Sequence, residues 1–269
     1  MGTSASSAGP GPGVSFDPPW LDDIDLPNEP QPVKEKPNNL PQPEMPVAPR
    51  SRFRNARRSM GDYVKSGNKD SLSRSLGHYS KTGMGGAQNV ANRLRVSTKV
   101  AANLFQSLRD LREGDNQPIG AIISELKSEG ADAYRFIDVI IENVCPDGGS
   151  LDETSHRDSG YAALGEFFQK SPDADISNLS DDNLWSLTAS FLGYETFSRI
   201  QLDIGQSFER QDIPVRDRVM RFNEMREYIK SEISSQINKH RNERQLSTDL
   251  QSILQTTIKN TFEVFEVEV

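Results

Sequence analysis

The sequence predicts an all-α protein, a multi-helix bundle that follows a long disordered N-terminal arm. Twelve of the 16 prolines lie within residues 1–49 of the 269-residue chain, and proline interrupts helices. From residue 50 onward, apolar residues recur every three or four positions, which is the period of one face of an α-helix. The alternation typical of a strand occurs only over residues 265–269, and it leaves the state of that segment open.

The N-terminal arm, residues 1–49, is predicted to be disordered and partly polyproline II. Its first 16 residues are mostly Gly, Ser, Ala and Pro, and the rest is rich in proline with scattered acids. Such a composition has too few apolar groups to offset the entropy lost on ordering. Within the arm, Phe16, Trp20 and Leu21 are large and apolar, and we interpret them as a docking motif for a partner. The alternative is that they are merely apolar residues of a linker.

Residues 50–113 are predicted to form a basic helical region. Its first helix ends at Gly67, because glycine readily adopts the left-handed conformation found after a helix C-terminus. Asn68 or Asp70 can then cap the second helix through a side-chain oxygen. The apolar stripes of these two helices are Phe53, Ala56, Met60 and Tyr63, followed by Leu72, Leu76 and Tyr79.

The glycine-rich stretch 83–86 is predicted to be a flexible joint, and one long helix is predicted over 87–111. The remainder, 114–269, is predicted to be a C-terminal helical domain. It begins with a short apolar turn over 119–126. Residues 134–144 are apolar nearly all round, which indicates a central buried helix.

Four further helices complete the predicted C-terminal domain. Ser180 is a good N-cap for one of them, and Pro214 suits the first turn of the next. The helix after Pro214 has a stripe that begins with Val215 and Val219 and runs to Ile237. The predicted spans are 151–169 (burying Tyr161, Leu164, Phe167 and Phe168), 184–208, 215–237 and 250–265.

Positive charge is concentrated in one part of an acidic chain. The net charge is −8, yet residues 50–100 hold twelve Lys or Arg against two acids. Arg52, Arg54, Arg57 and Arg58 form a basic patch at the start of the first helix. Such a patch could bind nucleic-acid phosphates or an acidic protein surface. Phe53 is the one aromatic residue among these arginines, so a platform for stacking bases is not indicated.

The sequence contains no recognisable catalytic or metal-binding motif. His78, His156 and His240 are far apart and lack ligand residues at metal-binding spacing, so we expect them at the surface or in the core. Cys145 ends an apolar helix and is predicted to be a buried, inert thiol. We expect no enzyme activity, no cofactor and no metal. The single cysteine and the lack of any long apolar run predict a cytoplasmic protein without a membrane segment.

The N-terminus offers a different kind of chemistry. Gly2 follows the initiator methionine, and loss of Met1 leaves an unhindered glycine amine at the end of a flexible tail. Because the pKa of an α-amino group is about 8, part of this amine is neutral at pH 7. Such a tail can enter the active site of another enzyme as a substrate. An ordinary frayed terminus remains the alternative.

Five stretches carry a resemblance to a known family. They are Met-Gly-Thr-Ser-Ala-Ser-Ser at 1–7, the Gly-Pro run at 9–13, Pro-Pro-Trp at 18–20, Arg-Phe-Arg-Asn-Ala-Arg at 52–57, and Leu-Gly-His-Tyr followed by Gly-Met-Gly-Gly within 76–86. Together they resemble the QatB family, the associated proteins of bacterial Qat anti-phage systems. Beyond residue 100 the resemblance rests on length and helical character.

The resemblance implies a four-component defence module: an ATPase, the QatB protein, a QueC-like enzyme and a TatD-like nuclease. QueC enzymes activate the carboxylate of a 7-deazaguanine with ATP and pass it to ammonia. A QueC-like relative could pass it to a protein amine instead, which forms an amide. The resemblance implies that Gly2 is the acceptor and that the modifying enzyme recognises the residues that follow, namely Thr3, Ser4, Ser6 and Ser7.

Three classes of function therefore stay open. The first is an adaptor whose tail is modified and whose helical body binds other components of the system. The second is a nucleic-acid-binding subunit that presents DNA to the nuclease through the basic patch. The third is an enzyme without recognisable motifs.

Overall fold

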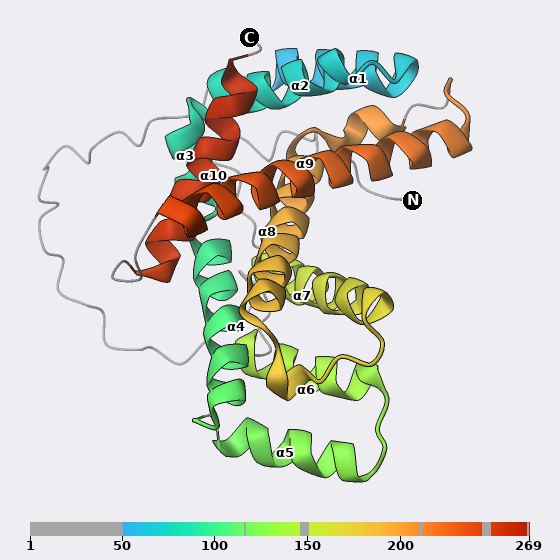
Figure 1. Cartoon of the computed structure of the whole chain (residues 1–269). Helices are drawn as coiled ribbons and strands as arrows, with labels where there is room; N and C mark the ends of the chain where they lie inside the picture. Colours follow the sequence, from blue (N-terminus) through green and yellow to red (C-terminus); the bar gives the residue numbers. More distant parts are fainter. Residues whose placement is uncertain (1–50, 116, 146–150, 210–211, 244–248, 268) are drawn as a thin grey trace, which may run out of the picture. The chain divides into compact units, whose positions relative to one another are not determined.

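The computed structural model describes residues 51–115, 117–145, 151–209, 212–243, 249–267 and 269, and these are all-helical (Figure 1). The all-α prediction is confirmed for this part of the chain, which contains no strand. The α-helices are α1 (Arg54–Ser66), α2 (Lys69–His78), α3 (Ala87–Arg93), α4 (Arg95–Glu113), α5 (Gln117–Ser128), α6 (Ala133–Val144), α7 (Leu151–Lys170), α8 (Asp181–Ile204), α9 (Val215–Glu243) and α10 (Leu250–Glu266). Shorter helical turns are the π-helical η2 (Tyr79–Met84) and the 3-10 turns η3 (Ile176–Asn178) and η4 (Gly205–Glu209).

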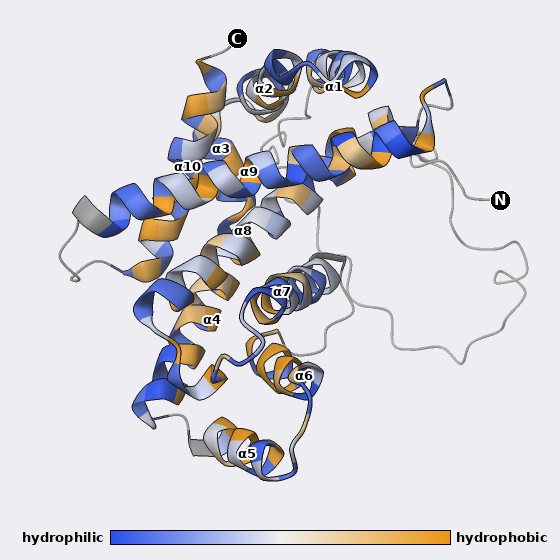
Figure 2. Cartoon of the chain, turned by 45° about the vertical axis from the view of Figure 1, so that its right-hand side comes forward, coloured by the Kyte–Doolittle hydropathy of each residue, from blue (hydrophilic) through white to orange (hydrophobic). Residues whose placement is uncertain are grey.

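Helix α8 is the central element of the packing. It contacts α4, α7 and α9, and it buries twelve of its residues. Helix α10 contacts α9 and also packs against α2, α3 and α4 (Figure 1). The apolar faces of the helices point inward and the polar faces outward (Figure 2). All ten helices belong to one compact unit, and its division into residues 50–113 and 114–269 stays a prediction.

Local signals at the helix ends are confirmed. Gly67 ends α1 with a φ of 71°, a value that glycine adopts without the clash that a side chain would cause. Asn68 is the cap of α2, because its side-chain oxygen accepts a hydrogen bond from the backbone N–H of Asp70 at 2.8 Å. Ser180 caps α8 in the same way, from the N–H of Asn183 at 3.2 Å.

Predictions between residues 83 and 111 are confirmed in part. At 83–86, η2 continues α2 as far as Met84, and the chain then bends at Gly85 and Gly86, whose φ values are 79° and 111°. The break expected there is present, and its flexibility stays a prediction. The expected helix 87–111 is divided at Leu94, whose φ of −92° and ψ of 14° are not α-helical. The division lets α3 pack against α10 while α4 turns towards α8.

Helices α5, α6 and α7 also differ from the sequence prediction. The expected turn at 119–126 is the full helix α5. Helix α6 is not central: Tyr134 is 74% exposed, and the helix buries one face, which includes Ile137 and Ile141. In α7, Leu164 and Phe168 are buried, whereas Tyr161 and Phe167 are half-buried.

The last two helices follow their predicted stripes with one exception. In α9, Val215 and Val219 are 65% and 54% exposed, so the buried stripe begins later, near Phe222. Helix α10 continues to Glu266, so the segment of undecided state begins as helix. None of the helices among the described residues is long and apolar enough to cross a membrane.

Candidate functional site

The predicted basic patch lies on the outer surface of α1 and the turn before it. Arg52, Arg54, Arg57 and Arg58, which we call the basic face, are all exposed. They point outward because the apolar stripe of the same segment faces the core. Its buried residues are Phe53, Ala56, Met60 and Tyr63. The four arginines are therefore accessible to a partner, and their role in binding stays a prediction from the sequence.

Two side chains of the basic face are used by the fold. Arg57 donates a hydrogen bond from Nη2 to the carbonyl oxygen of Asp203 at 2.9 Å. The guanidinium of Arg52 lies over the ring of Phe53, 4.6 Å from its centroid. Phe53 itself is only 6% exposed and stacks on Tyr79 at 5.3 Å, so it is not available to stack a base. Arg54 and Arg58 form no ion pair within the described residues.

The other predicted site residues lie outside the described residues. They are the acceptor Gly2, the recognition residues Thr3, Ser4, Ser6 and Ser7, and the docking residues Phe16, Trp20 and Leu21. Their roles stay predictions from the sequence.

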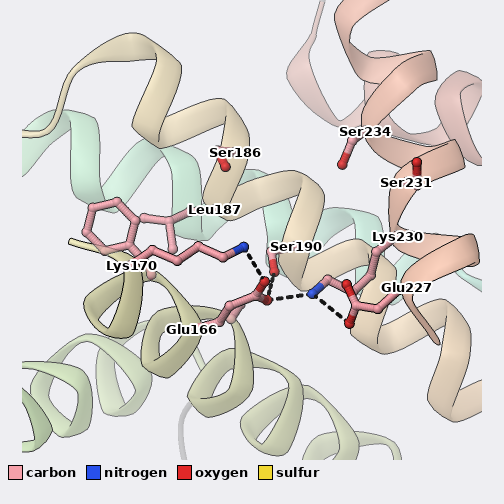
Figure 3. Close-up of a pocket in the computed structure, with 11 residues that line it drawn as sticks. Glu166, Lys170, Ser186, Leu187, Ser190, Glu227, Lys230, Ser231 and Ser234 are labelled. Atoms are coloured by element: carbon pink, nitrogen blue, oxygen red, sulfur yellow. Dashed lines mark hydrogen bonds and ion pairs between the residues drawn. The ribbon is translucent and has the colours of Figure 1, made fainter. Parts of the chain in front are cut away.

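A second candidate site lies where α7, α8 and α9 meet, and sequence reasoning missed it. Its centre is the carboxylate of Glu166 on α7 (Figure 3). Lys170 donates to Oε1 at 2.6 Å, and Lys230 of α9 donates to Oε2 at 2.5 Å. Two hydroxyls of α8 complete the set, from Ser190 at 3.0 Å and from Tyr194 at 3.3 Å.

The backbone of α8 makes room for Lys230. A Cβ at Gly193 would overlap the side chain of Lys230, so the absence of a side chain there lets α9 approach closely. As a result the side chain of Lys230 is only 9% exposed. Its ammonium group lies 4.6 Å from the ring centroid of Tyr194 and 3.5 Å from Glu227. The cation is thus held by two carboxylates and an aromatic face.

The electrostatics of this cluster favour the ionised form of Glu166. Burial opposes ionisation of Glu166, but the hydrogen bonds from Lys170, Lys230 and Ser190 outweigh it and lower its pKa to about 2. Burial is also the main reason that the pKa of Tyr194 is raised, so its hydroxyl stays protonated and donates. A strongly shifted pKa beside a hollow marks a candidate functional site.

Glu227 lines three hollows beside this cluster, and we call the three hollows together the groove. The first, of about 220 Å³, lies between α7, α8 and α9 and is shown in Figure 3. The second, of about 550 Å³, extends past Tyr161, Tyr194 and Arg226. The third, of about 500 Å³, reaches α1 and α2 at Tyr63 and Ser73.

A buried polar cluster joins α4, α7 and α8. His156 and Glu195 are 4% and 2% exposed, and Nδ1 of His156 lies 2.8 Å from Oε2 of Glu195. Ser97 and Ser155 also donate to this carboxylate, at 2.8 and 3.2 Å. His156 is therefore a core residue, which is one of the two locations predicted for it. His156 lines none of the three hollows, and its contact with Glu195 joins α7 to α8.

Cys145 is buried, as predicted. Burial and, to a lesser degree, the charge of Glu195 raise the pKa of its thiol to about 11. The thiolate is therefore scarce at neutral pH, which agrees with an inert side chain. Among the described residues, no group of His, Cys, Asp and Glu is arranged to hold a metal ion.

The comparison with known families covers most of the helical part of the chain. A family model described as Qat anti-phage system associated protein QatB matches residues 85–265. The chain belongs to the QatB family. It is therefore a component of the Qat anti-phage defence system. No curated protein and no solved structure matches the chain.

The extent of the match differs from the resemblance found in the sequence. Nearly all of the residues that suggested QatB lie before residue 85, whereas the family match begins there. The match includes α3 to α9 and nearly all of α10, and with them the Glu166 cluster and the His156–Glu195 pair. The basic face lies outside it. The part of the chain whose resemblance rested only on length and helical character is therefore most of the part that the family model matches.

Proposed function

We propose that this QatB-family chain is a non-catalytic adaptor of the Qat system, with two working parts. Its N-terminal glycine, Gly2, is the acceptor for a 7-deazaguanine acyl group delivered by a QueC-like partner. Its helical body binds other components of the same system. Membership of the family carries this proposal, together with the small, polar residues that follow Gly2 in the sequence.

The proposed modification is an amide bond. The QueC-like enzyme activates the 7-deazaguanine carboxylate with ATP to form an acyl adenylate and pyrophosphate. The neutral amine of Gly2 attacks the acyl carbon, AMP leaves, and the amine gives up one proton. Gly2 suits this attack because it has no side chain to hinder its nitrogen, and part of the amine is neutral since its pKa is about 8.

Reconstitution tests the proposal. Purified chain that begins at Gly2 is incubated with the QueC-like enzyme, ATP and 7-carboxy-7-deazaguanine, and its intact mass is measured. We expect the mass to rise by that of one 7-carboxy-7-deazaguanine less one water, only when ATP is present. Gly2→Pro should block the reaction, because a secondary amine in a ring is hindered, whereas Gly9→Ala should leave it unchanged. An unchanged mass, or modification of Gly2→Pro at the same nitrogen, would contradict the proposal.

The second candidate is a nucleic-acid-binding subunit, which the exposure of Arg54 and Arg58 favours. Phosphate contacts of this kind give binding that weakens steeply as salt is raised. The test uses the double variant Arg54→Glu, Arg58→Glu and leaves Arg57 in place, because Arg57 also holds the fold through Asp203. Loss of DNA binding together with a shallower salt dependence would support this candidate. Equal binding by the variant would exclude it.

A further inference from the structure

We infer that the groove on α7, α8 and α9 binds an extended segment of another polypeptide that is polar and carries no net charge. The inference rests on the proposed function in one respect only, that the helical body acts by binding other components. It does not depend on modification of Gly2. The occupant follows from the shape, the hydroxyl groups, the charge balance and the rigidity of the groove.

The shape fits a chain better than a compact ligand. Three hollows of about 220, 550 and 500 Å³ share Glu227, and two of them also share Glu166 and Lys170. Together they run from the exposed side of α7 across α9 to the α1–α2 pair. A small ligand would fill one hollow, whereas an extended peptide can place successive side chains in all three.

The lining offers groups that match peptide amides. Ser186, Ser231 and Ser234 line the first hollow, and their hydroxyls form no hydrogen bond within the described residues (Figure 3). A hydroxyl both donates and accepts, as the N–H and C=O groups of a peptide require in alternation. The larger hollows add tyrosines, which with serine are the residues that antibody combining sites use against polypeptides.

The charges of the groove cancel. Its four cations are balanced by four carboxylates: Lys69, Lys170, Arg226 and Lys230 against Asp70, Glu166, Glu224 and Glu227. A polyanion such as DNA gains its affinity from net positive charge, which this lining does not have. A strongly charged peptide of either sign would likewise meet repulsion from half of these groups.

The groove is already organised without an occupant. Lys230 and Tyr194 are fixed to Glu166, and the hydroxyl of Tyr63 donates to the carbonyl of Arg221 at 2.9 Å and lies 3.1 Å from Glu224. Side chains that are held in place before binding lose little entropy when a ligand arrives. A rigid surface of this kind supports specific binding of one segment.

The test blocks the groove without disturbing its ion pairs. Ser231 lies on the exposed side of α9 and lines two hollows, so Ser231→Trp places an indole where the peptide would lie. Asn238→Trp is the matched control, because Asn238 is exposed on the same helix but lines none of the three hollows. Both variants are first compared with the original chain by thermal unfolding, so that a folding defect is recognised.

Binding is measured between the full chain and each purified partner in turn: the QueC-like enzyme, the ATPase and the TatD-like nuclease. A DNA duplex serves as the nucleic-acid probe. We expect one protein to bind with weak salt dependence, Ser231→Trp to lose about tenfold or more in affinity, and Asn238→Trp to stay within about twofold. The inference is overturned if no partner binds, if Ser231→Trp binds like the original chain, or if the variant weakens DNA binding alone.

The intact mass of Gly2 is read separately in the same samples. If a partner binds the groove while Gly2 is unmodified, the proposed modification is contradicted and the inference about the groove stands. If Gly2 is modified but no partner binds the groove, the inference about the groove is contradicted and the proposed modification stands.

Discussion

The basic face and the groove are two charged regions of opposite design. The basic face belongs to one helix and the turn before it, has an excess of one sign, and exposes all four of its arginines. The groove is assembled mainly from three helices, has balanced charges, and holds Lys230 almost fully buried against Glu166. The family match includes the Glu166 cluster of the groove and excludes the basic face.

The two regions therefore contribute differently to stability and to binding. Exposed charges on a helix surface interact weakly with one another, so they are free to meet a partner and add little stability. A buried ion pair is costly to form, and it becomes strongly destabilising when one partner is removed. We therefore expect substitutions in the groove to change stability, and substitutions of Arg54 and Arg58 on the basic face to change binding only.

The largest effect is expected at Glu166. Glu166→Ala leaves the buried ammonium of Lys230 with one carboxylate, Glu227 at 3.5 Å, besides the ring of Tyr194, and should lower the free energy of unfolding by about 3 kcal/mol. Lys170→Ala is the control: its side chain is 72% exposed, so its loss should cost under about 1 kcal/mol. Urea unfolding of both variants measures the difference. Equal losses would show that the buried pair does not organise the groove.

Acid should weaken the same cluster. The pKa of Glu166 is lowered from 4.5 to about 2, so the folded state binds its proton less tightly than the unfolded state. The resulting stabilisation is fully present above pH 4.5 and is lost as pH falls towards 2. Glu166→Gln has no charge to lose, so the stability gap between it and the original chain should narrow by about 2 kcal/mol across this window. Urea unfolding at a series of pH values measures the gap, and a constant gap would contradict this assignment.

A smaller effect is expected where α8 and α9 approach each other. Gly193→Ala forces the stem of Lys230 away from α8 and should cost about 1–2 kcal/mol, the usual scale of overpacking. Gly165→Ala on α7 is the matched control, since a Cβ there meets nothing within 4 Å. Alanine at that position should stabilise the helix by about 0.5–1 kcal/mol. Thermal unfolding that shows the same sign for both changes would contradict the close approach at Gly193.

The smallest effect on stability is expected on the basic face. Arg54→Glu combined with Arg58→Glu should change the free energy of unfolding by less than about 0.5 kcal/mol, because both side chains are exposed. Chemical unfolding measures this, with Arg57→Ala as the comparison, since that change also removes the hydrogen bond to Asp203. A large loss in the double variant would show that these charges support the fold.

The sequence predicts features that depend on neighbouring residues. Gly67, Asn68 and Ser180 end or begin helices through their own backbone or side-chain chemistry, and each has its predicted place. The stripe of α1 likewise predicts which residues face outward, and with them the basic face. The break at Leu94 was missed because the apolar residues on both sides of it continue the same helical period.

Features that depend on distant residues could not be predicted in this way. Residues 134–144 are apolar enough for a central helix, but α6 has neighbours on one face only, so Tyr134 is exposed. Glu166 and Lys230 are 64 positions apart, and pairing them requires the packing of α7 against α9 around α8. The one local sign was that each charged residue adjoins an apolar core residue, since Glu166 directly precedes Phe167 and Lys230 directly follows Ile229. A charge at such a position needs a partner.

The central claim is that the tail of this chain is a substrate, and the mass of its N-terminal peptide tests this most directly. The chain is purified from cells that express the complete Qat system, digested, and analysed by mass spectrometry. We expect the nitrogen of Gly2 to carry a 7-deazaguanine acyl group in amide linkage, and cells lacking the QueC-like enzyme to yield a free glycine. A free Gly2 amine in both samples would contradict it.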